Sequence, residues 1–213
     1  ADWPNWRGPK HDGISREALP KADFSKIAWR AEIGVGFSGM AVADGRLFAM
    51  GCTGKRRGNQ EIFTCLDAVT GKVNWSDTYP AALVDYLHEG GPCATPTVHG
   101  KRVYGLSKSG RFACYNVANG EKYWTADLMA KAELPKPPEW GFAGSPLVLG
   151  NMVIVEATFT CAFNKTTGKE IWRSKKYKPA YGSSIVFQFK NKIYLATLKT
   201  DGLVILDAQT GKT

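Results

Sequence analysis

The sequence is sparing in cysteine, has no long apolar run and carries no extended block of charge. Its 213 residues include five cysteines, a density far below that of disulfide-stapled miniproteins. No CxxC pair is present, which argues against a structural zinc site. No apolar stretch approaches the roughly 18 residues that a membrane-spanning helix requires. These absences argue against a disulfide scaffold, a structural zinc site and a transmembrane helix within these 213 residues.

Motifs of several enzyme classes are missing as well. The sequence has no GxSxG, no phosphate-binding loop and no HExxH. Only three histidines are present, and His88 has no second histidine near it in the sequence. We therefore predict no catalytic residues and no metal site, and the balance of the sequence leans away from an enzyme.

Positive charge is in excess but dispersed. Lys and Arg total 28 against 19 Asp and Glu, for a net charge of +9 and a pI near 9.3. The basic residues cluster only at 55–57 and 173–178, so no basic arm of the kind that binds nucleic acid is present. We expect a solvated basic surface and no nucleic-acid partner, while an acidic polysaccharide or another anionic surface is compatible with the charge.

The cysteines allow two interpretations. Cys52 and Cys65 flank one expected hairpin and would form a disulfide if they faced each other across it. Alternatively, all five cysteines are buried free thiols that behave as small apolar side chains.

The main signal is an internal repeat. Four segments share an Asx-x-x-Thr/Asn-Gly turn, and in the first three a tryptophan follows four residues after the glycine. The glycines are spaced by 49, 48 and 43 residues. The predicted anchors of the repeat are Asp67, Gly71, Trp75, Asn116, Gly120, Trp124, Asn164, Gly168, Trp172, Asp207 and Gly211.

Each repeat also carries apolar runs separated by short polar turns, which are hairpin signals. The unit therefore reads as strand, turn, strand, loop, strand, Asx-Gly turn, strand. The Asx side chain accepts amide hydrogen bonds in the turn, glycine supplies a positive φ, and tryptophan buries a large surface between units. A period near 48 with about four strands predicts a β-propeller.

The pattern Ala-x-Thr-Gly-x-x-x-Trp, present from Ala68 to Trp75, resembles the repeat of PQQ-type, quinoprotein dehydrogenase-like propellers. The opening stretch from Asp2 to Pro9, followed by Asp12-Gly13, is similar to the start of secreted bacterial proteins with such repeats. The chain starts at Ala1 rather than Met, as a processed or trimmed chain does. The resemblance implies an all-β fold and an exported protein of the periplasm or cell envelope.

We expect four blades of four antiparallel strands, at residues 34–79, 90–128, 141–176 and 181–213, preceded by an extension over 1–23. Relatives of this kind have seven or eight blades, so the chain is interpreted as the N-terminal half of a longer propeller, with the missing half as a partner. A rival interpretation uses residues 24–33, which contain Trp29, as an outer strand that closes the ring of four blades.

Candidate binding residues come from the loops between blades. Long loops on one face carry His88, Glu89 and Trp140, with Tyr181 in a shorter loop. Lys55, Arg56 and Arg57 lie in an extended loop of the first blade. Because insertions on one face of a scaffold often carry function, we expect these seven residues to border the mouth of the central funnel.

Three functions are compatible with this sequence. The favoured one is a non-catalytic exported propeller that binds protein partners as a scaffold in the cell envelope. The resemblance also allows half of a dehydrogenase dependent on PQQ and calcium, although the adjacent cysteines of active members are absent. The third is a carbohydrate-binding or carbohydrate-processing propeller.

Overall fold

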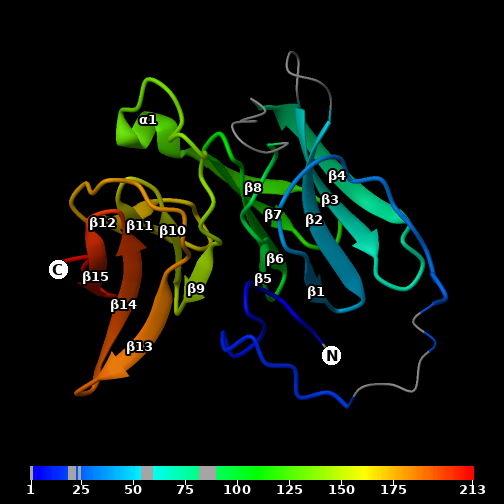
Figure 1. Ribbon diagram of the computed structural model, residues 1–213, viewed down its shortest axis with the longest axis horizontal. Helices are drawn as coiled ribbons and strands as arrows, with labels where there is room; N and C mark the ends of the chain where they lie inside the picture. Colours follow the sequence, from blue (N-terminus) through cyan, green and yellow to red (C-terminus); the bar gives the residue numbers. More distant parts are fainter. Residues whose placement is uncertain (1, 19–22, 24, 54–59, 82–89) are drawn as a thin grey trace.

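The chain folds into four antiparallel β-sheets that follow one another along the sequence (Figure 1). The computed structural model describes residues 2–18, 23, 25–53, 60–81 and 90–213. The first three sheets have four strands each, and the fourth has three. The predicted all-β propeller fold is confirmed, and the sheets form an open arc rather than a closed ring.

Within every sheet, strands that are adjacent in sequence are hydrogen-bonded neighbours. The first sheet contains β1 (Ala41–Ala43), β2 (Arg46–Thr53), β3 (Gln60–Asp67) and β4 (Val73–Pro80). The second contains β5 (Thr97–His99), β6 (Arg102–Leu106), β7 (Arg111–Asn116) and β8 (Lys122–Asp127). The third contains β9 (Leu147–Leu149), β10 (Met152–Glu156), β11 (Thr160–Asn164) and β12 (Glu170–Arg173). The fourth contains β13 (Ile185–Phe189), β14 (Lys192–Lys199) and β15 (Gly202–Asp207).

Local turn chemistry sets the ends of these strands. In the β1–β2 turn, Asp44 and Gly45 both have positive φ, at 49° and 70°, as a two-residue hairpin of type I′ requires. In the β3–β4 turn, the carboxylate of Asp67 accepts hydrogen bonds from the amides of Val69 and Thr70 at 3.1 and 2.8 Å. The chain therefore reverses where short polar residues replace the apolar ones.

The core lies between successive sheets. One apolar cluster joins the first and second sheets, another joins the second and third, and a third joins the third and fourth. At each junction a tryptophan from the last strand of one sheet lies against a turn glycine of the next. A Cβ atom at Gly120 would lie 2.7 Å from the Trp75 ring, and Gly168 stands in the same relation to Trp124.

Trp29 repeats this geometry in front of the first sheet. Its ring lies against Gly71, and its indole N–H donates to the Ala68 carbonyl at 3.3 Å. The described residues between 25 and 33 contain no strand. The role of residues 24–33 as a strand that closes the ring therefore remains a prediction.

The N-terminal segment lies along the inner edges of the first two sheets (Figure 1). Trp3 and Val42 of β1 exchange two backbone hydrogen bonds of 2.7 and 2.9 Å. The Pro4 carbonyl accepts from the amide of Val98 in β5 at 2.7 Å. The N-terminal segment thereby supplies hydrogen-bond partners for backbone groups on the edges of β1 and β5, which would otherwise be unpaired.

One short helix interrupts the β pattern. Helix α1 (Leu128–Ala132) follows β8 directly, and the side chain of its N-cap, Asp127, accepts from the amide of Ala130. Sequence analysis did not predict this helix, because five residues are too few for an apolar period to be recognised. No helix among the described residues is long and apolar enough to cross a membrane.

The disulfide hypothesis is wrong. The register of the β2–β3 hairpin places Cys52 opposite Glu61 and Cys65 opposite Phe48, so the two cysteines do not face each other. All five cysteines are free, and four of them are buried. The alternative of buried free thiols holds for Cys52, Cys65, Cys114 and Cys161, whereas Cys93 is partly exposed.

Candidate functional site in the central pocket

The loops between sheets meet the β-hairpin turns at one end of the molecule, which we call the loop end. The amide of Phe142, in the loop before β9, donates to the carbonyl of Lys108 in the β6–β7 turn at 2.9 Å. The amide of Tyr177, in the loop before β13, donates to Thr158 in the β10–β11 turn at 2.6 Å. The opposite end, formed by the β1–β2 and β3–β4 turns and their counterparts, is called the turn end.

A pocket of about 360 Å³ lies where the segments that lead into the four inner strands converge. We call it the central pocket. It is lined by corresponding positions of the four repeats and by one residue of the N-terminal segment. The lining residues are Trp6, Phe37, Gly39, Cys93, Thr95, Ala143, Ser145, Tyr181, Gly182 and Ser183.

The hydroxyl groups of this pocket hold neighbouring sheets together. The Thr95 amide donates to Ser145 Oγ at 3.0 Å, and the Ser145 amide donates to Ser183 Oγ at 2.8 Å. Each hydroxyl therefore accepts a backbone amide from the equivalent position of the preceding repeat. The Ser145 and Ser183 hydroxyls are engaged in this ladder, and the rings of Trp6, Phe37 and Tyr181 add aromatic contact surface to the pocket.

Two of the seven predicted site residues are described, and they lie together. The rings of Trp140 and Tyr181 have centroids 6.4 Å apart in an edge-to-face arrangement. The Trp140 amide also donates to the Tyr181 hydroxyl at 3.4 Å. Such edge-to-face pairs are a preferred aromatic geometry. The other five predicted residues, His88, Glu89, Lys55, Arg56 and Arg57, lie outside the described residues.

The sequence interpretation missed two aromatic residues of the central pocket. Phe37 occupies the same repeat position as Tyr181, and more than half of its side chain is exposed. Alignment of the segments before each inner strand would have revealed it. Trp6 lies in the non-repeating N-terminal segment, with the Arg7 guanidinium 5.5 Å from its ring centroid. No periodic signal points to Trp6, because only the tertiary fold brings it to the pocket.

A buried carboxylate lies at the junction of the first two sheets. Glu61 is fully buried, and it accepts from the Tyr79 hydroxyl and from the Lys108 amide, both at 3.1 Å. Burial raises the pKa of Glu61 above its ordinary value. Burial also lowers the pKa of Lys108, whose backbone amide donates to Glu61.

We expect Glu61 to make stability depend on pH in a defined direction. Since its pKa in the folded chain lies above the ordinary 4.5, its stabilising contribution is complete below 4.5 and is lost as pH rises through the folded pKa. In Glu61→Gln this loss disappears, so the free energy of unfolding of the variant, relative to wild type, increases with pH. Urea unfolding at a series of pH values measures the difference, and a constant offset contradicts the prediction.

The described residues do not offer a ready set of ligands for a calcium ion. None of them form a group of three or more His, Cys, Asp or Glu side chains that would hold a metal ion. The two buried carboxylates among the described residues already accept hydrogen bonds. Glu61 accepts from Tyr79 and Lys108. Glu156 accepts from Lys199, Thr160 and Ser184. Calcium prefers six to eight oxygen ligands, and the ladder hydroxyls already accept backbone amides.

These features define a β-propeller built from PQQ-like repeats. The sequence matches, over residues 87–213, the family described as Outer membrane protein assembly factor BamB. This match covers more than half of the chain, and the chain belongs to that family. No curated protein matches the sequence.

Solved structures share the fold at low sequence identity. A quinohemoprotein alcohol dehydrogenase from Comamonas testosteroni is 17% identical with a TM-score of 0.72, over 99% of this chain and 40% of the other. The quinohemoprotein alcohol dehydrogenase ADHIIG from Pseudomonas putida HK5 is 16% identical with a TM-score of 0.69, over 99% of this chain and 39% of the other. BamB from Moraxella catarrhalis is 16% identical with a TM-score of 0.56, over 81% of this chain and 45% of the other. The chain thus spans about two fifths of the length of the proteins it resembles, and the likeness concerns the fold alone.

Proposed function

We propose that this propeller is an exported, non-catalytic scaffold of the cell envelope that binds a protein partner at the central pocket. The observation that carries the proposal is the chemistry of this pocket. Two of its hydroxyls, on Ser145 and Ser183, are engaged in the inter-sheet ladder, while Trp6, Phe37 and Tyr181 offer aromatic contact surface. Buried aromatic anchors dominate the binding energy of protein interfaces, and the family match supports the same role.

Site-specific photo-crosslinking tests this proposal. A benzophenone amino acid in place of Tyr181 is expected to give a discrete protein adduct in cells that make the protein, and Trp140→Ala should weaken it. The matched control places the same probe at Tyr123, whose ring is also partly exposed but lies on β8 near the turn end. Equal adducts at both positions, or none at position 181, would contradict the proposal.

A dehydrogenase dependent on PQQ and calcium is the alternative that the structural neighbours favour. It requires ligands that the described residues do not supply, so they would come from elsewhere in the protein. Reconstitution with PQQ and calcium distinguishes the two functions, because the dehydrogenase would show quinone absorbance and oxidise an alcohol or sugar in a calcium-dependent manner.

A carbohydrate-binding propeller is the third candidate, favoured by the Trp140–Tyr181 pair. Aromatic rings stack on sugars and orient them in open sites. Glycan-array binding that is lost in Trp140→Ala would support this function, and an array without any binding would exclude it.

A further inference from the structure

The turn end of the molecule carries an excess of unpaired positive charge. The turns between its strands, with the segment after β15 and the Asx residue that begins each Asx turn, contain six lysines and four carboxylates, which are Lys72, Lys101, Lys165, Lys169, Lys190 and Lys212 against Asp44, Asp67, Glu121 and Asp207. Among the described residues, no carboxylate forms an ion pair with any of these lysines. At the loop end, by contrast, Lys176 and Lys178 are paired with Glu133 and Asp201.

One hairpin extends beyond the others at this end (Figure 1). The β13–β14 pair has five matched positions, whereas β1–β2, β5–β6 and β9–β10 each have three. The tip residues Lys190 and Asn191 both have positive φ, at 44° and 62°. Lysine rarely adopts this conformation, yet here it occupies the tip of the longest of these hairpins.

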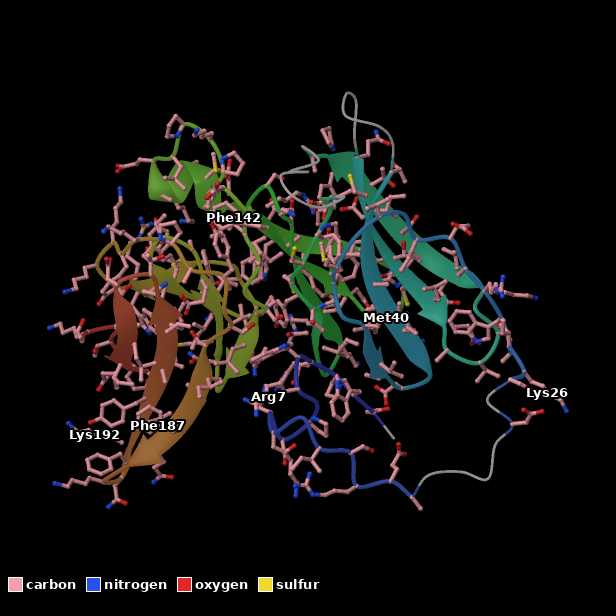
Figure 2. The ribbon with its side chains drawn as sticks, in the orientation of Figure 1. Arg7, Lys26, Met40, Phe142, Phe187 and Lys192 are labelled. Carbon is pink, nitrogen blue, oxygen red and sulfur yellow. The ribbon has the colours of Figure 1, made fainter. Side chains whose placement is uncertain are left out.

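The tip of this hairpin combines aromatic and apolar side chains with lysines. Phe189 is 57% exposed and Ile193 is 38% exposed. The Lys190 ammonium lies 5.4 Å from the centroid of the Phe189 ring. Figure 2 shows Lys192 and Phe187 projecting at this tip. On the first sheet, the turn next to Lys72 adds Val69, which is 78% exposed.

We propose that the turn end docks on an anionic phospholipid surface, with Phe189 entering the headgroup region and the lysines pairing with lipid phosphates. Aromatic rings next to lysines are the side chains that proteins place at membrane–water interfaces. Each basic residue near an anionic bilayer adds to the attraction, which fades within a Debye length. A soluble acidic protein or polysaccharide is the alternative partner, and retention on heparin without vesicle binding would reveal it.

Vesicle co-sedimentation with the intact purified protein tests the proposal. We expect binding to vesicles of phosphatidylcholine with roughly 30% phosphatidylglycerol, no binding to pure phosphatidylcholine, and release at about 0.5 M salt. Phe189→Ser and the pair Lys190→Glu with Lys192→Glu should each weaken binding about tenfold or more. The pair Lys136→Glu with Lys175→Glu, which makes the same charge change at the loop end, should leave it intact.

A spectroscopic measurement separates insertion from adhesion. Tryptophan placed by Phe189→Trp should be quenched by brominated lipids more strongly than the wild-type tryptophans. Circular dichroism and an unchanged urea midpoint establish that each variant is folded. Retention on heparin without vesicle binding, equal weakening by both lysine pairs, or no additional quenching in Phe189→Trp would overturn the proposal.

Discussion

Replacement of Trp75 by alanine is expected to lower the free energy of unfolding by about 3–5 kcal/mol, the usual cost of removing a buried aromatic residue. The Trp75 ring is 9% exposed and stacks on Phe63 with centroids 5.8 Å apart. It also contacts Tyr115 of the second sheet, again at 5.8 Å. Because the turn around Gly120 closes directly onto this ring, the cavity cannot collapse easily. The midpoint and slope of urea unfolding measure the loss.

A milder substitution separates packing from hydrogen bonding. The indole N–H of Trp75 donates to the Val117 carbonyl at 3.0 Å. The equivalent nitrogen of Trp172 is buried and has no hydrogen-bond partner among the described residues. Phenylalanine at position 75 leaves a carbonyl unpaired, at a cost of about 1–3 kcal/mol, whereas at position 172 it removes an unsatisfied donor. Trp75→Phe should therefore be the more destabilising variant, and equal losses would show that the hydrogen bond contributes little.

Much of this fold was predictable because its information is local and repeated. The Asx side chain, the glycine and the tryptophan of each unit act within a few residues or on the next unit, so their spacing indicates blades. The register of Cys52 and the pairing of Trp3 with Val42 were not predictable. Both depend on how distant segments settle against each other, and neither leaves a periodic pattern.

The candidate site was also only partly predictable from the sequence. Trp140 and Tyr181 were expected together because both lie in loops at one end of the blades, and the structure places their rings in contact. Trp6 reaches the central pocket from outside the repeat, so position in the repeat gives no indication of it. The buried pair of Glu156 and Lys199 was missed for a related reason. A single sequence does not reveal which charged strand residues face inward when their alternation with apolar residues is irregular.

Breaking this buried pair is the second change from which we expect a large loss of stability. Lys199 and Glu156 form a salt bridge between the third and fourth sheets, and their side chains are 1% and 3% exposed. The hydroxyls of Thr160 and Ser184 also donate to the Glu156 carboxylate. Lys199→Met keeps the length of the side chain but leaves a buried carboxylate without its countercharge. We expect the free energy of unfolding to fall by about 3–5 kcal/mol, measured by urea unfolding at neutral pH.

The double variant shows whether charge is the cause. Adding Glu156→Gln to Lys199→Met removes the unpaired charge and keeps an oxygen that accepts from the two hydroxyls. The double variant should therefore be more stable than Lys199→Met alone, as a coupled pair requires. Lys176→Met is the surface control, since it breaks a 2.8 Å pair with an exposed Glu133 and should leave the urea midpoint unchanged. If the second substitution restores nothing, an isolated buried charge is not the cause of the loss in Lys199→Met.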